Sequence, residues 1–169
     1  MYSDPIAYFI TCTCYGTWLP GDDRGWIRWH SGHQPPRPLL CHWCHDRMHE
    51  PMVILNDSER SLVETTVCDH CVYRNWELYR VNCRTTHFHV VLAAPGVDGG
   101  KVRDQLKAWS TRRLRESQQP TDECPPSRTH WWARGGSVRV IFDEGSLAAA
   151  IEYAGEGQQR GGSHAAKQQ

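Results

Sequence analysis

The 169-residue sequence lacks an excess of charge of either sign, because 19 basic and 19 acidic residues cancel to a formal net charge of +0. Overall charge therefore gives a nucleic-acid role no support, and such a role has to rest on local clusters of basic residues. The chain also lacks an apolar run near the roughly 20 residues that cross a bilayer, so we expect no membrane partner. Residues 1–10 show no basic leader before a long apolar core, and we expect a cytoplasmic protein.

The sequence is rich in cysteine and histidine, with 8 and 10 residues respectively. In a reducing compartment, cysteines are more often thiols or metal ligands than disulfides. The length suits one domain of ordinary size. We expect a single catalytic domain over residues 1–160, a variable insertion without steady periodicity over residues 20–56, and a disordered polar tail over residues 161–169.

The pattern of apolar residues predicts a mixed α+β fold. Strands are expected over residues 8–14, 76–83, 88–93 and 137–142, and helices over residues 56–75, 101–116 and 147–153. This order predicts a ferredoxin-like, four-stranded antiparallel sheet (βαββαβ) with two helices on one face and the last helix on the other. The residues expected on the buried sides of the first two helices are Leu62, Val63, Thr66, Val67, Val72, Val102, Leu106 and Trp109.

His87 and His89 form a His-Phe-His motif on a predicted strand. Because side chains alternate along a strand, both imidazoles face one side, with Cβ atoms roughly 7 Å apart, and both can reach one cation. The alternative is a pair of hydrogen-bonded sheet histidines. Burying two imidazoles beside residues 90–92 is costly unless they are satisfied. Two nitrogens with open positions for oxygen ligands favour Mg²⁺ or Mn²⁺ acting on a phosphate over a closed zinc site.

Two Cys-x-x-Cys pairs form a second constellation, Cys41 with Cys44 and Cys68 with Cys71. This spacing is known from structural zinc sites, in which four thiolates complete a tetrahedral shell. A structural Zn²⁺ would tie the insertion to the first helix. The alternative is reduced thiols in small apolar environments.

Basic residues dominate the predicted helix over residues 101–116, and such a helix is typical of phosphate contact. A solvated helix face is the alternative. Trp131 and Trp132 offer stacking surfaces for an unpaired strand, or are core residues. The residues that we expect to contact DNA are Arg103, Lys107, Arg112, Arg113, Arg115 and Arg134.

Four stretches of the chain resemble, in order, the single-tyrosine transposases of the HUH endonuclease superfamily, notably the REP-associated tyrosine transposases and their relatives in insertion sequences. Residues 8–24 (YFITCTCYGTWLPGDDR) are similar to the family's opening strand and loop, and residues 81–92 (VNCRTTHFHVVL) to its His-hydrophobic-His strand. Residues 102–116 are similar to its basic helix, and residues 132–158 to its closing strand and tyrosine helix. The resemblance leaves residues 25–56 largely unaccounted for.

The resemblance implies that Tyr153 is a nucleophile that attacks a phosphodiester, forming a 5′-phosphotyrosine and freeing a 3′-hydroxyl. Without the resemblance, Tyr153 would be interpreted as a partly buried aromatic residue at a helix end. The family's third metal ligand lies about one turn beyond the tyrosine, where Gln158 is the better match and Glu156 the alternative. Gly155 and Gly157 weaken the helix there by up to about 1 kcal/mol each relative to alanine.

The implied function is that of a metal-dependent endonuclease and strand transferase, a transposase acting on single-stranded, hairpin-containing DNA. Relatives of the insertion-sequence type act as dimers that exchange the tyrosine helix, whereas REP-associated ones can act as monomers, so a homodimer is one of two expectations. A second hypothesis is a nucleic-acid-binding module on the same scaffold that does not cleave and is stabilised by zinc.

Overall fold

The computed structural model describes residues 4–28, 30–118 and 128–155. Its centre is a four-stranded antiparallel sheet in the order β4-β5-β1-β6. The predicted α+β class and four-stranded antiparallel sheet are confirmed. The strands are β1 (Ala7–Thr13), β4 (Glu77–Cys83), β5 (His87–Ala93) and β6 (Ser137–Ile141).

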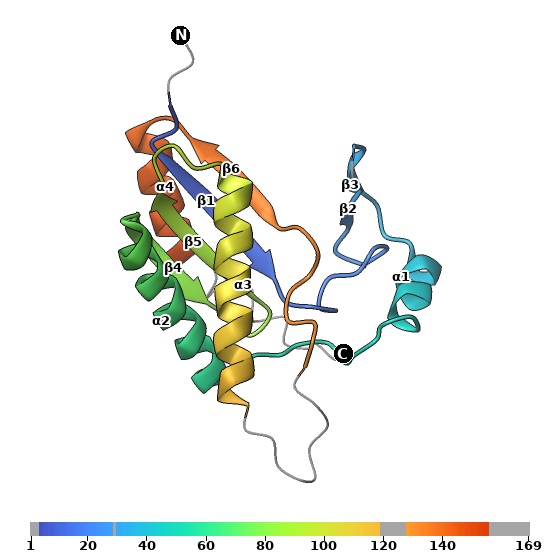
Figure 1. Ribbon diagram of the computed structural model, residues 1–169. Helices are drawn as coiled ribbons and strands as arrows, with labels where there is room; N and C mark the ends of the chain where they lie inside the picture. The colour runs from blue at the N-terminus through green and yellow to red at the C-terminus, as the bar shows by residue number, and fades with distance from the viewer. Residues whose placement is uncertain (1–3, 29, 119–127, 156–169) are drawn as a thin grey trace, which may run out of the picture.

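Helices cover both faces of the sheet (Figure 1). On one face lie α2 (Asp57–Arg74) and α3 (Gly99–Ser117), and on the other lies α4 (Glu144–Gly155). The larger apolar core lies between the sheet and the α2–α3 pair and includes Phe88 and Val90, whereas Val91 belongs to a smaller core under α4. Alternate side chains of β5 therefore pack into the cores on the two faces of the sheet, and the histidines of this strand face α4.

Reciprocal capping fixes the start of α2. The Asn56 side chain accepts a hydrogen bond from the backbone N–H of Glu59 at 2.9 Å, and the Glu59 carboxylate accepts one from the backbone N–H of Asn56 at 2.9 Å. The helix ends at Asn75, whose φ of 55° is left-handed, a conformation that asparagine tolerates. The predicted bounds of this helix are confirmed.

Two residues predicted to be buried are not. Val72 is 82% exposed and Trp109 is 39% exposed. In α2 the buried stripe runs through Val63, Val67 and Cys71, and Val72 lies roughly 140° around the helix from Val67, on the solvent side. In α3 the stripe continues to Ser110 and Leu114 instead, and Trp109 lies beside it.

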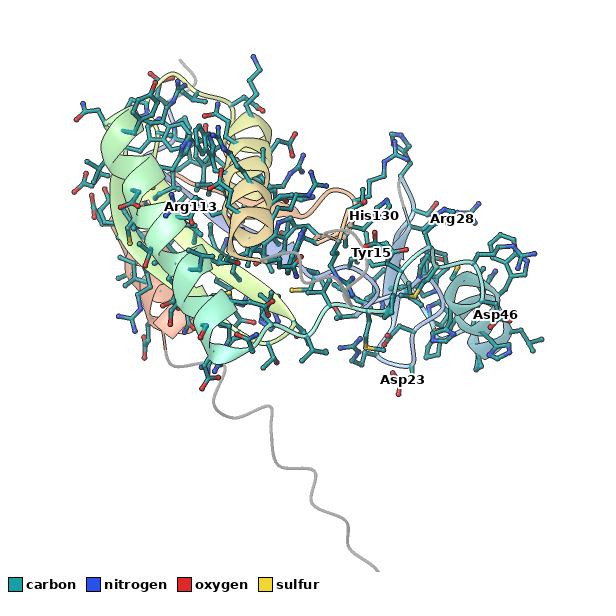
Figure 2. All side chains as sticks on the ribbon, turned by 60° about the horizontal axis from the view of Figure 1, so that its bottom comes forward. Tyr15, Asp23, Arg28, Asp46, Arg113 and His130 are labelled. Atoms are coloured by element: carbon teal, nitrogen blue, oxygen red, sulfur yellow. The ribbon has the colours of Figure 1, made fainter. Side chains whose placement is uncertain are left out.

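The insertion between β1 and α2 contains three short elements, which the lack of periodicity did not predict. They are β2 (Trp26–Arg28), β3 (Gly32–Gln34) and α1 (Pro38–His45). The insertion leaves and re-enters the body at neighbouring points, because the backbone N–H of Val53 donates to the carbonyl of Tyr15 at 2.9 Å and that of Leu55 to Thr85 at 2.8 Å. Figure 2 shows Tyr15 beside His130 at this junction, and their ring centroids are 5.1 Å apart.

Within the described ranges, no helix is long and apolar enough to cross a bilayer. The expected polar tail over residues 161–169 lies outside the described residues.

Replacing the N-cap of α2 tests the capping box. Asn56→Ala removes the side-chain acceptor for the Glu59 N–H, and we expect the free energy of unfolding to fall by about 1 kcal/mol. Urea unfolding followed by circular dichroism measures it. The control is Ser58→Ala, a change at an exposed position of the same helical turn, for which we expect a change within about 0.5 kcal/mol. Equal effects of the two substitutions would contradict the assignment.

Candidate active site

His87 and His89 lie side by side on β5, on the face of the sheet that α4 covers. Their ring centroids are 4.8 Å apart and the ring planes meet at 69°. His89 is buried, with 5% exposure, and His87 is half-buried. The Thr86 hydroxyl lies 3.1 Å from Nδ1 of His87. The strand thus presents two imidazoles to one place, one deep and one nearer to solvent.

A row of polar side chains crosses the sheet at His89. Asn82 and Thr11 are its partners on the two neighbouring strands, and Ser137 pairs with Thr11 on β6. The Thr11 hydroxyl lies 2.8 Å from Nδ1 of His89, which sets the orientation of the ring and leaves Nε2 as the atom of His89 for a ligand. Burial, with a smaller effect of His87 and Arg84, lowers the pKa of His89 to about 4. The ring is therefore neutral at pH 7, the form that coordinates metals.

Tyr153 stands near the end of α4, directly over His89. Its ring meets the His89 ring at a centroid distance of 5.8 Å and the Phe9 ring at 5.8 Å, both edge-on. The side chain is 54% exposed, so the phenol is accessible. A cleft of about 440 Å³ opens between the sheet and α4. We call it the Tyr153 cleft. Its lining residues are Phe9, Thr11, His89, Ser137, Arg139, Ala149, Ala150 and Tyr153.

The end of α4 is held by the edge strand β4. The last carbonyls of a helix have no partner within the helix, and here the Asn82 amide donates to those of Ala154 at 2.8 Å and Gly155 at 3.3 Å. Gly155 admits the Arg80 guanidinium, because a Cβ at this position would lie 2.9 Å from Cζ of Arg80. The helix continues to Gly155, and the predicted third ligands, Gln158 and Glu156, lie outside the described residues.

Three of the basic residues of α3 face the segment that leads into β6. Lys107 donates to two backbone carbonyls of that segment at 2.7 and 2.8 Å. Arg115 donates to the carbonyls of residues 128–129 at 3.2 and 3.0 Å. Arg103 donates to the carbonyl of Gly136 at 3.3 Å, and it also pairs with Asp104 on its own helix at 2.8 Å. These side chains tie the segment to the helix.

The other basic residues point elsewhere. Arg112 pairs with Glu116 at 2.9 Å, Arg113 lines a hollow between α2 and α3, and Arg134 is exposed in the loop before β6. The expected DNA-binding residues therefore do not form one continuous face, because their spacing distributes them around the helix.

The tryptophans considered for stacking are core residues. Trp131 is 3% and Trp132 is 8% exposed, and Trp132 packs edge-on against Phe88 at a centroid distance of 4.9 Å. Neither ring offers a surface to an unpaired base.

The structure does not bring the two cysteine pairs together. Cys41 and Cys44 lie on α1 in the insertion, and Cys68 and Cys71 lie on α2 in the body (Figure 1). Cys68 is exposed and Cys71 buried, and burial raises the pKa of Cys71 to about 12, which favours the thiol. In the part of the chain that the structure describes, no group of three or more His, Cys, Asp or Glu side chains is arranged to hold a metal ion. The expected four-cysteine zinc site thus has no support in this geometry.

Sequence reasoning missed two residues of this site, Thr11 and Asn82, whereas Arg139 was considered as a source of positive charge for an unpaired strand. Each of the two missed residues is a cross-strand partner of His89, and each is brought there by the register of the sheet. Their alternation along the strands was the available signal, but it does not indicate which residues become cross-strand neighbours.

No protein-family model matches the sequence, and no curated protein matches it. Among solved structures, the fold is similar to that of a REP-associated tyrosine transposase bound to a REP hairpin, with a TM-score of 0.52. The likeness covers 91% of this chain and 67% of that chain at 12% sequence identity. At this identity it concerns the fold.

Removing the amide that holds α4 tests how Tyr153 is positioned. For Asn82→Ala we expect a loss of about 1 kcal/mol of stability, since two carbonyls lose their donor. We also expect faster hydrogen exchange of the α4 amides, measured by mass spectrometry, and unchanged exchange in α2, which lies on the other face. Unchanged exchange in α4 would contradict this role.

Proposed function

We propose that this protein is a metal-dependent, single-strand DNA endonuclease and strand transferase of the HUH type, built on a ferredoxin-like scaffold. The observation that carries the proposal is the position of Tyr153, an accessible phenol over His89 in an open cleft that Arg139 also lines. A phenol from a helix and imidazoles from a central strand give a nucleophile beside candidate metal ligands. The likeness to a REP-associated tyrosine transposase bound to a REP hairpin supports DNA, in hairpin form, as the partner.

The reaction exchanges one phosphodiester for another. The Tyr153 oxygen attacks phosphorus while its proton passes to solvent, a Tyr–O–P bond forms to the 5′ phosphate, and the P–O3′ bond breaks. The leaving oxygen takes up a proton and becomes a 3′-hydroxyl. Attack by a 3′-hydroxyl on the phosphotyrosine reverses the step, so rejoining needs no nucleotide hydrolysis.

His87 and His89 are the residues that would hold Mg²⁺ or Mn²⁺, with Gln158 or, alternatively, Glu156 as the third ligand. The neutral, hydrogen-bonded His89 ring fits this role. When bound, such an ion stabilises negative charge on the phosphate. Arg139, an exposed residue on β6, adds positive charge to the same cleft.

The covalent intermediate is directly testable. With hairpin-bearing oligonucleotides and Mn²⁺, a 3′-end label should move with the protein on a denaturing gel, and a 5′-end label should appear in a shorter fragment. Tyr153→Phe removes the attacking oxygen, and we expect it to abolish both products.

Tyr79→Phe is the matched control, since Tyr79 packs in the small core under α4, and we expect normal adduct formation. An adduct from Tyr153→Phe, or none from the wild type across a broad panel of hairpins, would refute the mechanism. DNA binding without any adduct would favour the non-cleaving module.

Mn²⁺ affinity tests the histidine site. For His89→Ala we expect binding to be lost, and for Thr11→Val, which removes the partner of Nδ1, we expect affinity to fall roughly 10- to 100-fold. Electron paramagnetic resonance of free Mn²⁺ provides the measurement. Thr66→Val makes the same chemical change on α2, and its affinity should match the wild type. An unchanged affinity in His89→Ala would exclude this site.

A further inference from the structure

A second hollow lies on the other side of the sheet, between α2 and α3, with a volume of about 160 Å³. Tyr73, at 79% exposure, and Trp109, at 39%, are large apolar side chains at its opening, and exposed clusters of this kind often mark binding sites. Figure 2 shows Arg113 on this helical layer. The residues that line the hollow, which we call the aromatic groove, are Thr66, Asp69, His70, Tyr73, Trp109 and Arg113.

The walls of the aromatic groove are held in place around His70. This residue is 6% exposed, and its Nε2 lies 3.1 Å from the side-chain oxygen of Gln105 on α3. Its ring packs against Trp109 at a centroid distance of 5.7 Å and edge-on against Trp76 at 5.3 Å. Tyr73 completes the cluster at 6.4 Å. A ligand would therefore meet a largely preformed aromatic surface, which lowers the entropic cost of binding.

Charged groups around the groove select the chemistry of the ligand. Arg113 lines the groove, and the guanidinium carbon of Arg112 lies 5.4 Å from the Trp109 ring. The guanidinium carbon of Arg74 lies 5.4 Å from the Trp76 ring. Asp69 is the acidic side chain of the lining. These groups suit a planar aromatic ligand that carries negative charge and offers an N–H donor.

We propose that the aromatic groove binds one unpaired base of single-stranded DNA, stacked on Tyr73 and Trp109, with the adjoining phosphate at Arg113 and a base N–H donating to Asp69. The choice of nucleic acid rests on the proposed function. At about 160 Å³ the groove is smaller than the roughly 300–1,000 Å³ of small-molecule sites, so it admits a base and not a whole cofactor. Proline-rich peptides also bind aromatic grooves, but they bring no phosphate for Arg113.

The groove and the Tyr153 cleft lie on opposite faces of the sheet, because α2 and α3 cover one face and α4 the other. A strand held in the groove is thus remote from the phosphodiester at Tyr153. The groove would anchor flanking DNA, and its variants can be tested apart from cleavage.

Fluorescence anisotropy with a labelled 12-nucleotide single strand tests the proposal. Because stacking of one base contributes substantially to affinity, Tyr73→Ala and Trp109→Leu should each weaken binding roughly 5- to 100-fold. Arg113→Ala should reduce the slope of log affinity against log salt by about 1. The matched control is Val72→Ala, at an 82% exposed apolar residue beside Tyr73 that does not line the groove. Its affinity should stay within about twofold of the wild type.

Photo-crosslinking locates the base. Oligonucleotides that contain 5-iododeoxyuridine should crosslink to peptides carrying Tyr73 or Trp109, in the wild type and equally in Tyr153→Phe. If the wild type forms no covalent adduct but Tyr73→Ala and Trp109→Leu still weaken DNA binding, the proposed function is refuted and the groove assignment stands. If the wild type forms the adduct normally and both Tyr73→Ala and Trp109→Leu bind DNA like the wild type, the groove proposal is overturned. Binding of a polyproline peptide in the groove without displacement of the DNA overturns it as well.

Discussion

The alternation of side chains along β5 is the constraint on which the rest of the structure depends. Phe88 and Val90 are completely buried against α2 and α3, and they fix the strand in the middle of the molecule. The same backbone turns His87 and His89 to the opposite face. A one-residue slip of register would move both imidazoles into the larger core, so the apolar residues that stabilise the fold also determine where the chemistry is placed.

Much of the scaffold could be predicted, because helices and strands with strong periodicity carry their own signal. Asn56 and Asn75 marked the ends of α2, and the alternation of β5 predicted which residues share a face. The elements of the insertion were missed because β2 and β3 span three residues each and α1 only eight, too few for periodicity to accumulate. Exposed positions such as Trp109 were missed because burial beside a second helix depends on tertiary packing.

The site was harder to predict than the fold. His87 and His89 are two positions apart in sequence, so local geometry sufficed to bring them together. Thr11 and Asn82 reach His89 only through the register of three strands, which no local pattern encodes. The basic residues of α3 show the opposite error. Nearness in sequence suggested one cluster, although at 3.6 residues per turn Lys107 and Arg113 lie roughly 120° apart around the helix axis.

The paired ends of the insertion have an energetic consequence. The length-dependent part of the entropy lost on closing a loop of this size is roughly 3 kcal/mol. Val53 and Leu55, which pair with the body where the loop returns, are almost completely buried, and burial of each aliphatic side chain contributes about 1.5–3 kcal/mol. The entropic cost of closing the loop is thus offset by the burial of these two side chains at its base. The intervening residues are free to change in length and composition at little cost to the stability of the sheet.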